Sequence, residues 1–462
     1  MIRKVLIANR GEIALRIIRA CRELGIRSVL AHSDIDRASL PARLADETVC
    51  IGPATPGKSY LNIPNLVTAA LMKECDAVHP GTGFLAENPY FAEVCEKCDL
   101  TFIGPKADVI AVMSDKAAAR QEMRRAGLEV LPGSESPLRS LDEAQTLAAD
   151  IGFPVILKAV AGGGGRGIRV AHDEAGLAVE YLTAQAEALA AFGNGQLYLE
   201  KYLAKCRHVE IQIIGDMHGS VIHLGDRECS LQRRHQKLVE EGPSVLSPTE
   251  RAALGKAAAD GAARVGYTNA GTLEFLWADG HAYFSEMNTR IQVEHGVTEL
   301  LTGVDLVKEQ IHVASGERLS IRQEDVTLRG HAIECRITAE SADDDFQPRF
   351  GTVSNYLPPG GTGVRVESHL YTGYSVPIHY DSLLAKLLTW GNDRAEAIAR
   401  MESALSEYVI EGVTTVIPFQ QRIMADANFR AGDVHTRYLE TMIAADRERR
   451  ILETANQLRG PE

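Results

Sequence analysis

The first 105 residues alternate between short apolar runs and amphipathic stretches, and this alternation constrains the fold more than any other feature of the chain. Residues 4–8 (KVLIA) predict a buried strand, residues 12–24 have helical apolar spacing, and Gly25 follows as a helix stop. Further strand-like runs are SVLAH, CDAVHPG and TFIGP. Alternation of strands and helices predicts a parallel, doubly wound sheet with helices on both faces. We expect this α/β domain to span residues 1–113.

A glycine run lies between two strand-like segments, PVILKAV and IRV. Gly162, Gly164 and Gly167 formally satisfy the dinucleotide pattern GxGxxG, but that site needs a helix after the glycines, and here a strand follows. A dehydrogenase is therefore disfavoured. A glycine loop between strands can instead lie over nucleotide phosphates, and the alternative is a flexible hairpin tip. Lys158, on the entering strand, favours the phosphate site because its ammonium can reach the same anions.

Residues 284–295 (FSEMNTRIQVEH) carry polar side chains at every second position. Written as a strand, the segment places Glu286, Asn288, Arg290, Gln292 and Glu294 on one face. A solvated edge strand would explain such a face, although two carboxylates, two amides and an arginine are an uncommon mixture for one. From this segment alone, a binding site and a solvated face both stay open.

Residues 271–288 predict a hairpin around Asp279-Gly280. A two-residue loop would put Glu274 and Glu286 on opposite faces, whereas a three-residue loop that includes His281 would put them directly opposite each other. Opposed like charges are destabilising, and a divalent cation between them turns the repulsion into attraction. We therefore predict the three-residue loop and a Mg²⁺ site.

The rest of the chain predicts two further domains. A helix follows Ser114, which we expect to cap it, and the chain becomes β-rich from about residue 197, with HVEIQI typical of a strand buried on one side. After residue 328, short strands with Pro/Gly turns precede helices at 394–408 and 417–425. The expected domains are 1–113, 114–328 and 329–446, with a charged tail at 447–462. The expected fold class is multidomain α/β and α+β.

Charge and apolar content exclude several classes of protein. The net charge of −13 argues against non-specific nucleic-acid binding. We see no apolar run of membrane-spanning length and no signal peptide. The eight cysteines are scattered, so we interpret them as reduced thiols, including the Cys95–Cys98 pair, and expect a cytoplasmic protein.

Several motifs occur in one order along the chain: KAVAGGGGRGIRV, EKYL, RHVEIQ, RRHQKLVEE, TLEFL, EMNTRIQVEH and ECRITAE. Together they resemble biotin carboxylase, an ATP-grasp enzyme found as a component or domain of acetyl-, propionyl- and pyruvate-type carboxylases. The resemblance covers essentially the whole chain. It implies an ATP-grasp domain over residues 114–328, with a mobile Gly-rich lid at about 132–203, and a C-terminal biotin carboxylase domain over 329–446.

The resemblance also implies roles for matching residues. The ATP site would comprise Lys116, Lys158, Gly164, Gly165, Glu200, Lys201, Leu203, His208, Gln232 and His235. Mg²⁺ or Mn²⁺ would be held by Glu274, Glu286 and Asn288. Bicarbonate would be held by Lys237, Arg290 and the backbone of Val293, with Glu294 as its general base. Arg336 would face the ureido oxygen of biotin. From the residues alone, Lys116 is better interpreted as an exposed lysine and Arg336 as half of a structural ion pair.

The implied activity is ATP- and bicarbonate-dependent carboxylation of biotin through carboxyphosphate, as in the acetyl-CoA carboxylase of fatty acid biosynthesis. The sequence has no Met-Lys-Met biotinylation motif. A separate biotin carboxyl carrier protein and carboxyltransferase subunits would then be partners, and the family implies a homodimer. Another ATP-grasp ligase and a catalytically altered nucleotide-binding paralogue stay open, because Thr82 and Gly296 stand where the family usually has tyrosine and proline.

Overall fold

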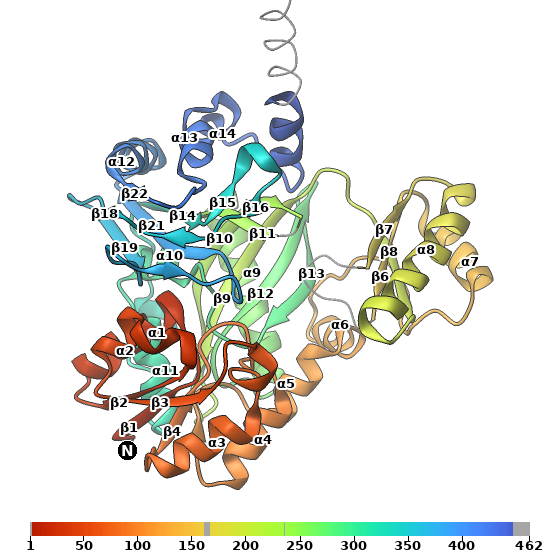
Figure 1. Ribbon diagram of the computed structural model, residues 1–462. Coiled ribbons are helices and arrows are strands. Elements are labelled where there is room, and N and C mark those ends of the chain that lie inside the picture. Colours follow the sequence, from red (N-terminus) through yellow and green to blue (C-terminus); the bar gives the residue numbers. More distant parts are fainter. Residues whose placement is uncertain (1, 161–166, 235, 447–462) are drawn as a thin grey trace, which may run out of the picture.

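The computed structural model describes residues 2–160, 167–234 and 236–446. Its N-terminal part contains a five-stranded parallel sheet in the order β3-β2-β1-β4-β5, drawn in red and orange in Figure 1. The strands are β1 (Lys4–Ile7), β2 (Arg27–Ser33), β3 (Glu47–Gly52), β4 (Ala77–His79) and β5 (Thr101–Phe102). The parallel sheet predicted from the alternation is confirmed.

Helices cover both faces of this sheet. Val5 and Ile7 of β1 pack in one core with α1 (Gly11–Glu23), whereas Leu6 packs in a second core with α3 (Ile63–Met72) and α4 (Pro89–Lys97). Successive side chains of a strand point to opposite faces, so a central strand that is apolar throughout needs two such covers. A short helix, α2 (Leu40–Leu44), completes this part.

Eight antiparallel strands form the central sheet, in the order β13-β12-β9-β10-β11-β14-β21-β19. They are β9 (Arg207–Gly215), β10 (Val221–Arg233), β11 (Gln236–Gly242), β12 (Asn269–Ala278), β13 (His281–Asn288), β14 (His331–Thr338), β19 (Val364–Ser368) and β21 (Leu383–Gly391). Because β11 pairs with β14, the sheet continues across residue 328, where we expected a domain boundary. The domain boundaries stay predictions.

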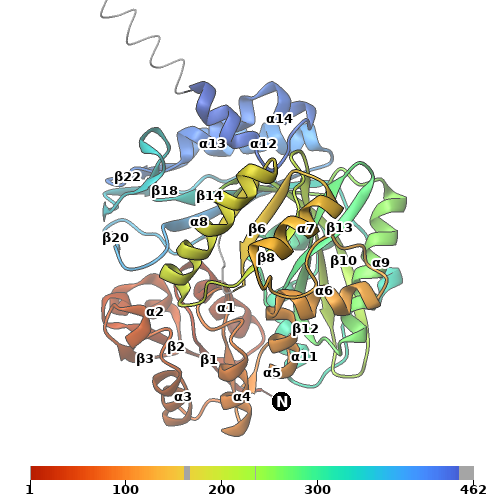
Figure 2. The same cartoon turned by 90° about the vertical axis from the view of Figure 1, so that its right-hand side faces the viewer.

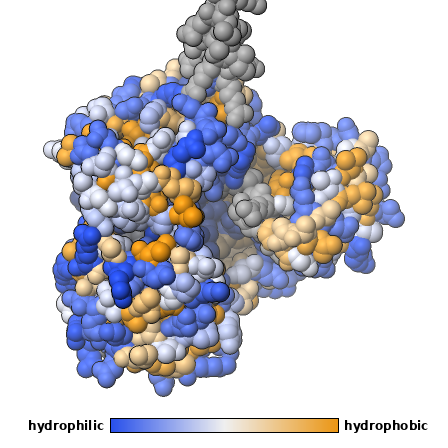
Figure 3. Space-filling view, in the orientation of Figure 1, coloured by the Kyte–Doolittle hydropathy of each residue, from blue (hydrophilic) through white to orange (hydrophobic). Residues whose placement is uncertain are grey.

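A smaller unit stands apart from this body (Figure 1). It is a three-stranded sheet, β7-β6-β8, with its own apolar core. Its elements are α7 (Leu141–Ile151), β6 (Val155–Ala159), β7 (Ile168–Ala171), α8 (Glu174–Phe192) and β8 (Leu197–Lys201). Figure 2 shows α7 and α8 on the outer side of this sheet, and Figure 3 shows the surface hollowed between the unit and the body.

The remaining helices pack against the central sheet or connect its parts. They are α5 (Ala107–Ser114), α6 (Lys116–Arg125), α9 (Pro248–Arg264), α10 (His295–Thr302), α11 (Leu306–Ala314), α12 (Arg394–Glu407), α13 (Ile417–Ala425) and α14 (Ala427–Ala431). Short strands complete the C-terminal part: β15 (Glu340–Ser341), β16 (Gln347–Pro348), β17 (Gly351–Thr352), β18 (Asn355–Leu357), β20 (Ser375–Val376) and β22 (Val409–Glu411). Within the described ranges, every helix is too short or too polar to cross a bilayer.

Two local expectations are corrected. The cap of α6 is Asp115, whose carboxylate accepts from the backbone N–H groups of Ala117 and Ala118, and Ser114 instead ends α5. Strand β9 is buried on both faces, so Glu210 and Gln212 are fully buried rather than solvated. The polar side chains that alternate with apolar ones along β9 therefore lie inside the protein.

Candidate active site

The hairpin of β12 and β13 places two carboxylates face to face. Glu274 pairs directly with Glu286, as predicted, but the predicted three-residue loop is wrong. Ala278 pairs with His281, so the loop is Asp279-Gly280, and both residues have the positive φ that a two-residue hairpin turn needs. The register then shifts between Glu274 and Phe275. A β-bulge in β13, not the loop, therefore brings the two carboxylates together.

The predicted strand over 284–295 is also only partly correct. Strand β13 ends at Asn288, and α10 begins at His295. The intervening segment leaves the sheet, yet its polar side chains still turn back toward Glu274. Asn288 Nδ2 and Gln292 Nε2 each donate to Glu274 Oε1 at 2.8 Å. A turn, rather than strand alternation, gathers these groups.

Lys237 lies at the centre of the polar cluster. Its Nζ is 2.6 Å from Glu210 Oε2, 2.9 Å from Glu274 Oε1 and 2.5 Å from Glu294 Oε1. Burial alone would lower the pKa of Lys237, but the three carboxylates outweigh it and raise the pKa well above its ordinary value. The site therefore has a fixed cation that is already surrounded by acids.

Glu294 is buried between two cations. Its Oε1 accepts from Lys237, and its Oε2 accepts from Arg336 NH2 at 3.0 Å. Burial raises the pKa of this carboxyl, but Lys237, Arg336 and Arg227 outweigh burial and hold the pKa well below the ordinary range. An anion that drew these cations away would raise the pKa of Glu294 and make it a stronger base.

The other residues predicted for bicarbonate and biotin lie beside this base. Arg290 Nε donates to Glu87 at 2.9 Å, and its NH2 donates to the Asn288 side chain at 3.1 Å. The backbone carbonyl of Val293 accepts from the fully buried Lys386 at 2.7 Å. Lys237, Arg290, Val293, Glu294 and Arg336 therefore converge at one place, although they come from three separate parts of the chain.

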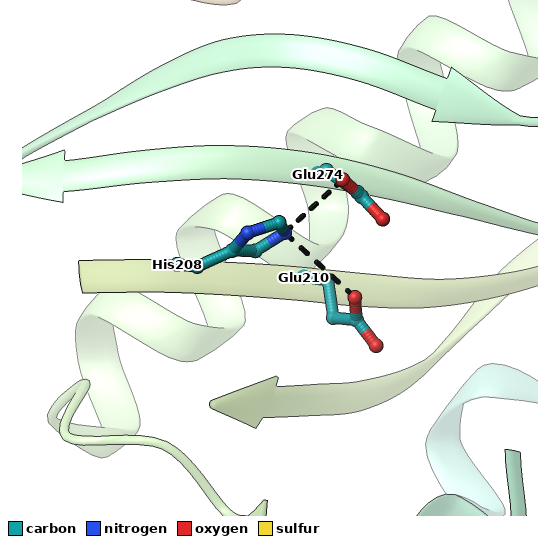
Figure 4. Close-up of side chains that lie close together, drawn as sticks. All are labelled: His208, Glu210 and Glu274. Carbon is teal, nitrogen blue, oxygen red and sulfur yellow. Dashed lines mark ion pairs between the residues drawn. The ribbon is translucent and has the colours of Figure 1, made fainter. Parts of the chain in front are cut away.

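A divalent cation fits the acidic end of this cluster. Ligand atoms of His208, Glu210 and Glu274 lie within 4.8 Å of one another, and His208 Nε2 is 3.1 Å from Glu274 (Figure 4). Burial and the facing Glu274 raise the pKa of Glu286, which records the repulsion between the opposed carboxylates. Mg²⁺ and Mn²⁺ prefer oxygen ligands and would relieve this repulsion. Of the predicted ligands, Asn288 joins the cluster through its hydrogen bond to Glu274.

The residues predicted for ATP are spread over the body and the three-stranded unit. Lys116 Nζ lies 3.9 Å from Glu286, at the acidic end of the cluster. Lys158 donates to Glu200 at 2.5 Å, and Arg120 also binds Glu200. Gln232 and His208 contact each other at 3.4 Å. Lys201 donates to two backbone carbonyls of its own unit, Leu203 follows β8, and Gly164, Gly165 and His235 lie outside the described residues.

Replacing Lys158 with alanine is expected to weaken ATP binding at least about tenfold, because a charge-assisted hydrogen bond contributes about 1.5–3 kcal/mol. Isothermal titration with ATP and Mg²⁺ measures the affinity. Lys97→Ala, which removes an exposed lysine paired with Glu93 on α4, is the control and should bind as the wild type does. Equal affinities for the two variants would remove Lys158 from the phosphate site.

Several residues of the cluster cannot be recognised from the sequence, because each lies in an ordinary-looking strand or loop. Glu87, Glu210, Arg227, Glu240 and Lys386 were not singled out. Arg227 is fully buried and donates to Gln212, Gln292 and Thr298 at 2.7–2.8 Å. The sequence does contain one signal, the row of polar residues along RHVEIQ and DREC, and these side chains are buried because other parts of the protein cover that face of the sheet.

The structure also accounts for one departure from the family pattern. A Cβ at Gly296 would lie 2.5 Å from Leu388 Cδ2, so a side chain at this position would require Leu388 to shift. At Thr82, the backbone carbonyl accepts from Asn9 at 2.7 Å. Nearby, Phe84 lies in an aromatic group with Tyr60 and Tyr380, at centroid distances of 5.0 and 6.5 Å.

Three family models match the chain in order. They describe the biotin carboxylase N-terminal domain (residues 1–110), the ATP binding domain of carbamoyl-phosphate synthase L chain (115–322) and the biotin carboxylase C-terminal domain (334–441). With the fold, the ATP-binding match defines the class, an ATP-dependent ligase of the ATP-grasp type.

Full-length relatives narrow this class. The chain is 54% identical over 441 residues to a biotin carboxylase of Nostoc sp., with 95% of this chain and 99% of the relative covered. It is 52% identical over 449 residues to a biotin carboxylase of Pseudomonas aeruginosa, with 97% of this chain and 100% of the relative covered. The chain belongs to the biotin carboxylase family.

Solved structures agree with this assignment. The biotin carboxylase domain dimer of Hydrogenobacter thermophilus 2-oxoglutarate carboxylase, in complex with MgADP, ADP and bicarbonate, has a TM-score of 0.92 at 50% identity, covering 96% of this chain and 98% of that one. A biotin carboxylase complex with β-γ-ATP from Campylobacter jejuni has a TM-score of 0.93 at 48% identity, covering 96% and 99%.

Proposed function

We propose that this chain carboxylates biotin on a separate carrier protein, with ATP and bicarbonate as co-substrates. The observation that carries the proposal is the convergence of Lys237, Glu294 and Arg336. Two partly buried cations are bound there to one buried carboxylate, at 2.5 and 3.0 Å. This arrangement suits a small anion that must be held and also deprotonated.

The first half-reaction makes carboxyphosphate. Lys237 and Arg290 bind bicarbonate, and Glu294 takes its proton. The carbonate oxygen then attacks the γ-phosphorus of ATP, the bond to the β-phosphate oxygen breaks, and ADP leaves. Lys116 and Lys158 hold the phosphates. Glu274, Glu286 and Asn288, with His208 and Glu210 beside them, would hold Mg²⁺ or Mn²⁺, which neutralises phosphate charge when bound.

The second half-reaction transfers the carbon. Carboxyphosphate splits into CO₂ and phosphate, and the phosphate takes the N–H proton of the biotin ureido ring. The ureido nitrogen then attacks CO₂ while Arg336 holds the oxygen, on which negative charge develops. Arg336 is suited to this because its guanidinium lies at the same cluster as the base.

The full carboxylation cycle needs a biotinylated carrier and a carboxyltransferase as well as a biotin carboxylase. We propose a biotin carboxyl carrier protein and carboxyltransferase subunits as partners, and a homodimer, the state in which the relative from Hydrogenobacter thermophilus was solved. The transferase, not this chain, would select the final acyl-CoA or 2-oxoacid acceptor. We propose a cytoplasmic location, and the eight cysteines, all of them free thiols, support it.

The test is phosphate release from ATP with Mg²⁺, with and without bicarbonate and free biotin. Release that needs bicarbonate and rises with biotin supports the proposal. Phosphate release that needs bicarbonate but rises neither with free biotin nor with a biotinylated carrier would contradict biotin as the acceptor. Release that ignores bicarbonate would contradict the whole assignment and favour a ligase for another acid.

A further inference from the structure

Two fully buried carboxylates face each other behind Arg336. Glu240 of β11 pairs directly with Glu334 of β14 across adjacent antiparallel strands, and both side chains are inaccessible to solvent. Glu240 Oε1 binds Arg336 at 2.5 Å. The other three oxygens, Glu240 Oε2 and both of Glu334, have no hydrogen-bond partner among the described residues. Two anions in this arrangement would repel each other, and Glu334 has no hydrogen bond among the described residues to offset the repulsion.

The charged groups around the pair do not remove this problem. Arg336 lies on the same strand as Glu334, and Lys237 lies on the same strand as Glu240. Glu294 approaches from the segment before α10 and Lys386 from β21. Lys386 donates to the Val293 carbonyl at 2.7 Å and lies 3.5 Å from Glu12 of α1, so its hydrogen bonds go elsewhere. Arg336 is shared between Glu240 and Glu294.

We propose that Glu240 and Glu334 are positioning residues that share one proton, and that the single negative charge left on the pair holds Arg336 in place for the reaction. This inference rests on the role of Arg336 in the proposed function. With one proton, the pair offers Arg336 one carboxylate beside that of Glu294. Without the proton, Glu240 and Glu334 are both anions, and both compete with Glu294 for the guanidinium of Arg336.

Burial supports this interpretation of the geometry. It raises the pKa of Glu240 to about 7 and the pKa of Glu334 well above its ordinary value, although Arg336 and Lys386 act in the opposite direction. Both pKa values are higher in the folded than in the unfolded chain. The stability that the shared proton contributes is therefore fully present below about pH 4.5 and is lost as the pH rises through the folded-state values.

The test compares the wild type with Glu334→Gln, which imitates a carboxyl that cannot lose its proton. Urea unfolding from about pH 7 to about pH 9 measures the slope of stability against pH, which reports the protons lost on unfolding. We expect the wild-type slope to be steeper by about one proton near about pH 7, and the two slopes to converge toward about pH 9, where the folded wild type has lost the shared proton. The ratio of bicarbonate-dependent phosphate release at about pH 9 to that at about pH 7 should be several-fold higher in the variant.

A matched control lies next to Glu240. Glu241 is also buried, but His331 and Arg394 bind its oxygens at 2.6–3.1 Å and lower its pKa to about 2. It is ionised throughout this range, so Glu241→Gln should lower stability without changing the slope. If Glu334→Gln does not fold, infrared spectra of the wild type still decide the matter. We expect a protonated carboxyl band at about pH 7 that weakens toward about pH 9.

The outcomes separate the two proposals. Equal slopes in wild type and Glu334→Gln, or no protonated carboxyl band, would overturn the shared proton. A changed slope with an unchanged activity ratio would overturn the positioning role. The slope and the infrared band do not depend on turnover, so the shared proton can be established even if phosphate release proves independent of bicarbonate and the proposed function fails.

Discussion

Glu294→Gln is expected to lower bicarbonate-dependent phosphate release by about 10²–10⁴-fold, the usual contribution of a general base. The amide keeps the shape of the side chain and can still fill the space between Lys237 and Arg336, but it cannot accept the proton of bicarbonate. ATP affinity should stay within about twofold, since the contacts of Glu294 are with Lys237 and Arg336 and not with Lys116 or Lys158. Steady-state phosphate release and ATP titration together measure both quantities.

Glu309→Gln is the matched control for this substitution. Glu309 is also buried, but it lies on α11, where its Oε1 accepts from the Ser320 hydroxyl at 2.5 Å. The control should retain bicarbonate dependence. An unchanged rate in Glu294→Gln would remove Glu294 as the base and leave deprotonation to another group. A variant that loses ATP binding as well would show that Glu294 organises the nucleotide site.

Much of the secondary structure and the parallel sheet could be predicted from local pattern, because periodicity and turn residues report them directly. The opposition of Glu274 and Glu286 was predicted correctly on an incorrect basis. The two-residue turn at Asp279-Gly280 is the one that the sequence favours, and a bulge near Ser285 corrects the register. Serine has no property that marks a bulge, so only the finished sheet reveals it.

The second layer of the site could not be predicted for a different reason. Alternation of apolar and polar residues reports two faces of a strand, but it does not say whether the polar face meets water or a buried site. Glu210, Glu240 and Glu334 were therefore indistinguishable from solvated residues. Their burial depends on what covers the faces of the central sheet, where α10 packs on β10, β11 and β14 and α9 packs on β9 and β10.

Lys237→Met is expected to have a double effect, on catalysis and on stability. The thioether replaces the stem of the lysine but removes the charge that Glu210, Glu274 and Glu294 share at 2.5–2.9 Å. Removal of one partner of a buried ion pair costs about 3–5 kcal/mol, because the remaining charges stay buried and uncompensated. Bicarbonate-dependent phosphate release should fall below detection, since an anion would then face three carboxylates.

The pH dependence distinguishes this cause from a general packing defect. In the wild type, Lys237 helps to lower the pKa of Glu274 and Glu294 below the ordinary value, so these groups contribute stability above about pH 4.5 that is lost as the pH falls through their folded-state values. In Lys237→Met, the carboxylates can relieve their repulsion only by taking up protons. The difference in unfolding free energy between variant and wild type should therefore be largest near about pH 7.5 and shrink toward about pH 5.

Urea unfolding at the two pH values measures this difference, with Lys256→Met as the control. Lys256 is 75% exposed and pairs with Asp260 one helical turn away, so its loss should cost less than about 1 kcal/mol at either pH. A deficit in Lys237→Met that stays constant with pH would indicate a cavity or a packing fault instead. A deficit that shrinks in acid would establish that the charge of Lys237, which awaits bicarbonate in the proposed reaction, also holds its three acids in the folded protein.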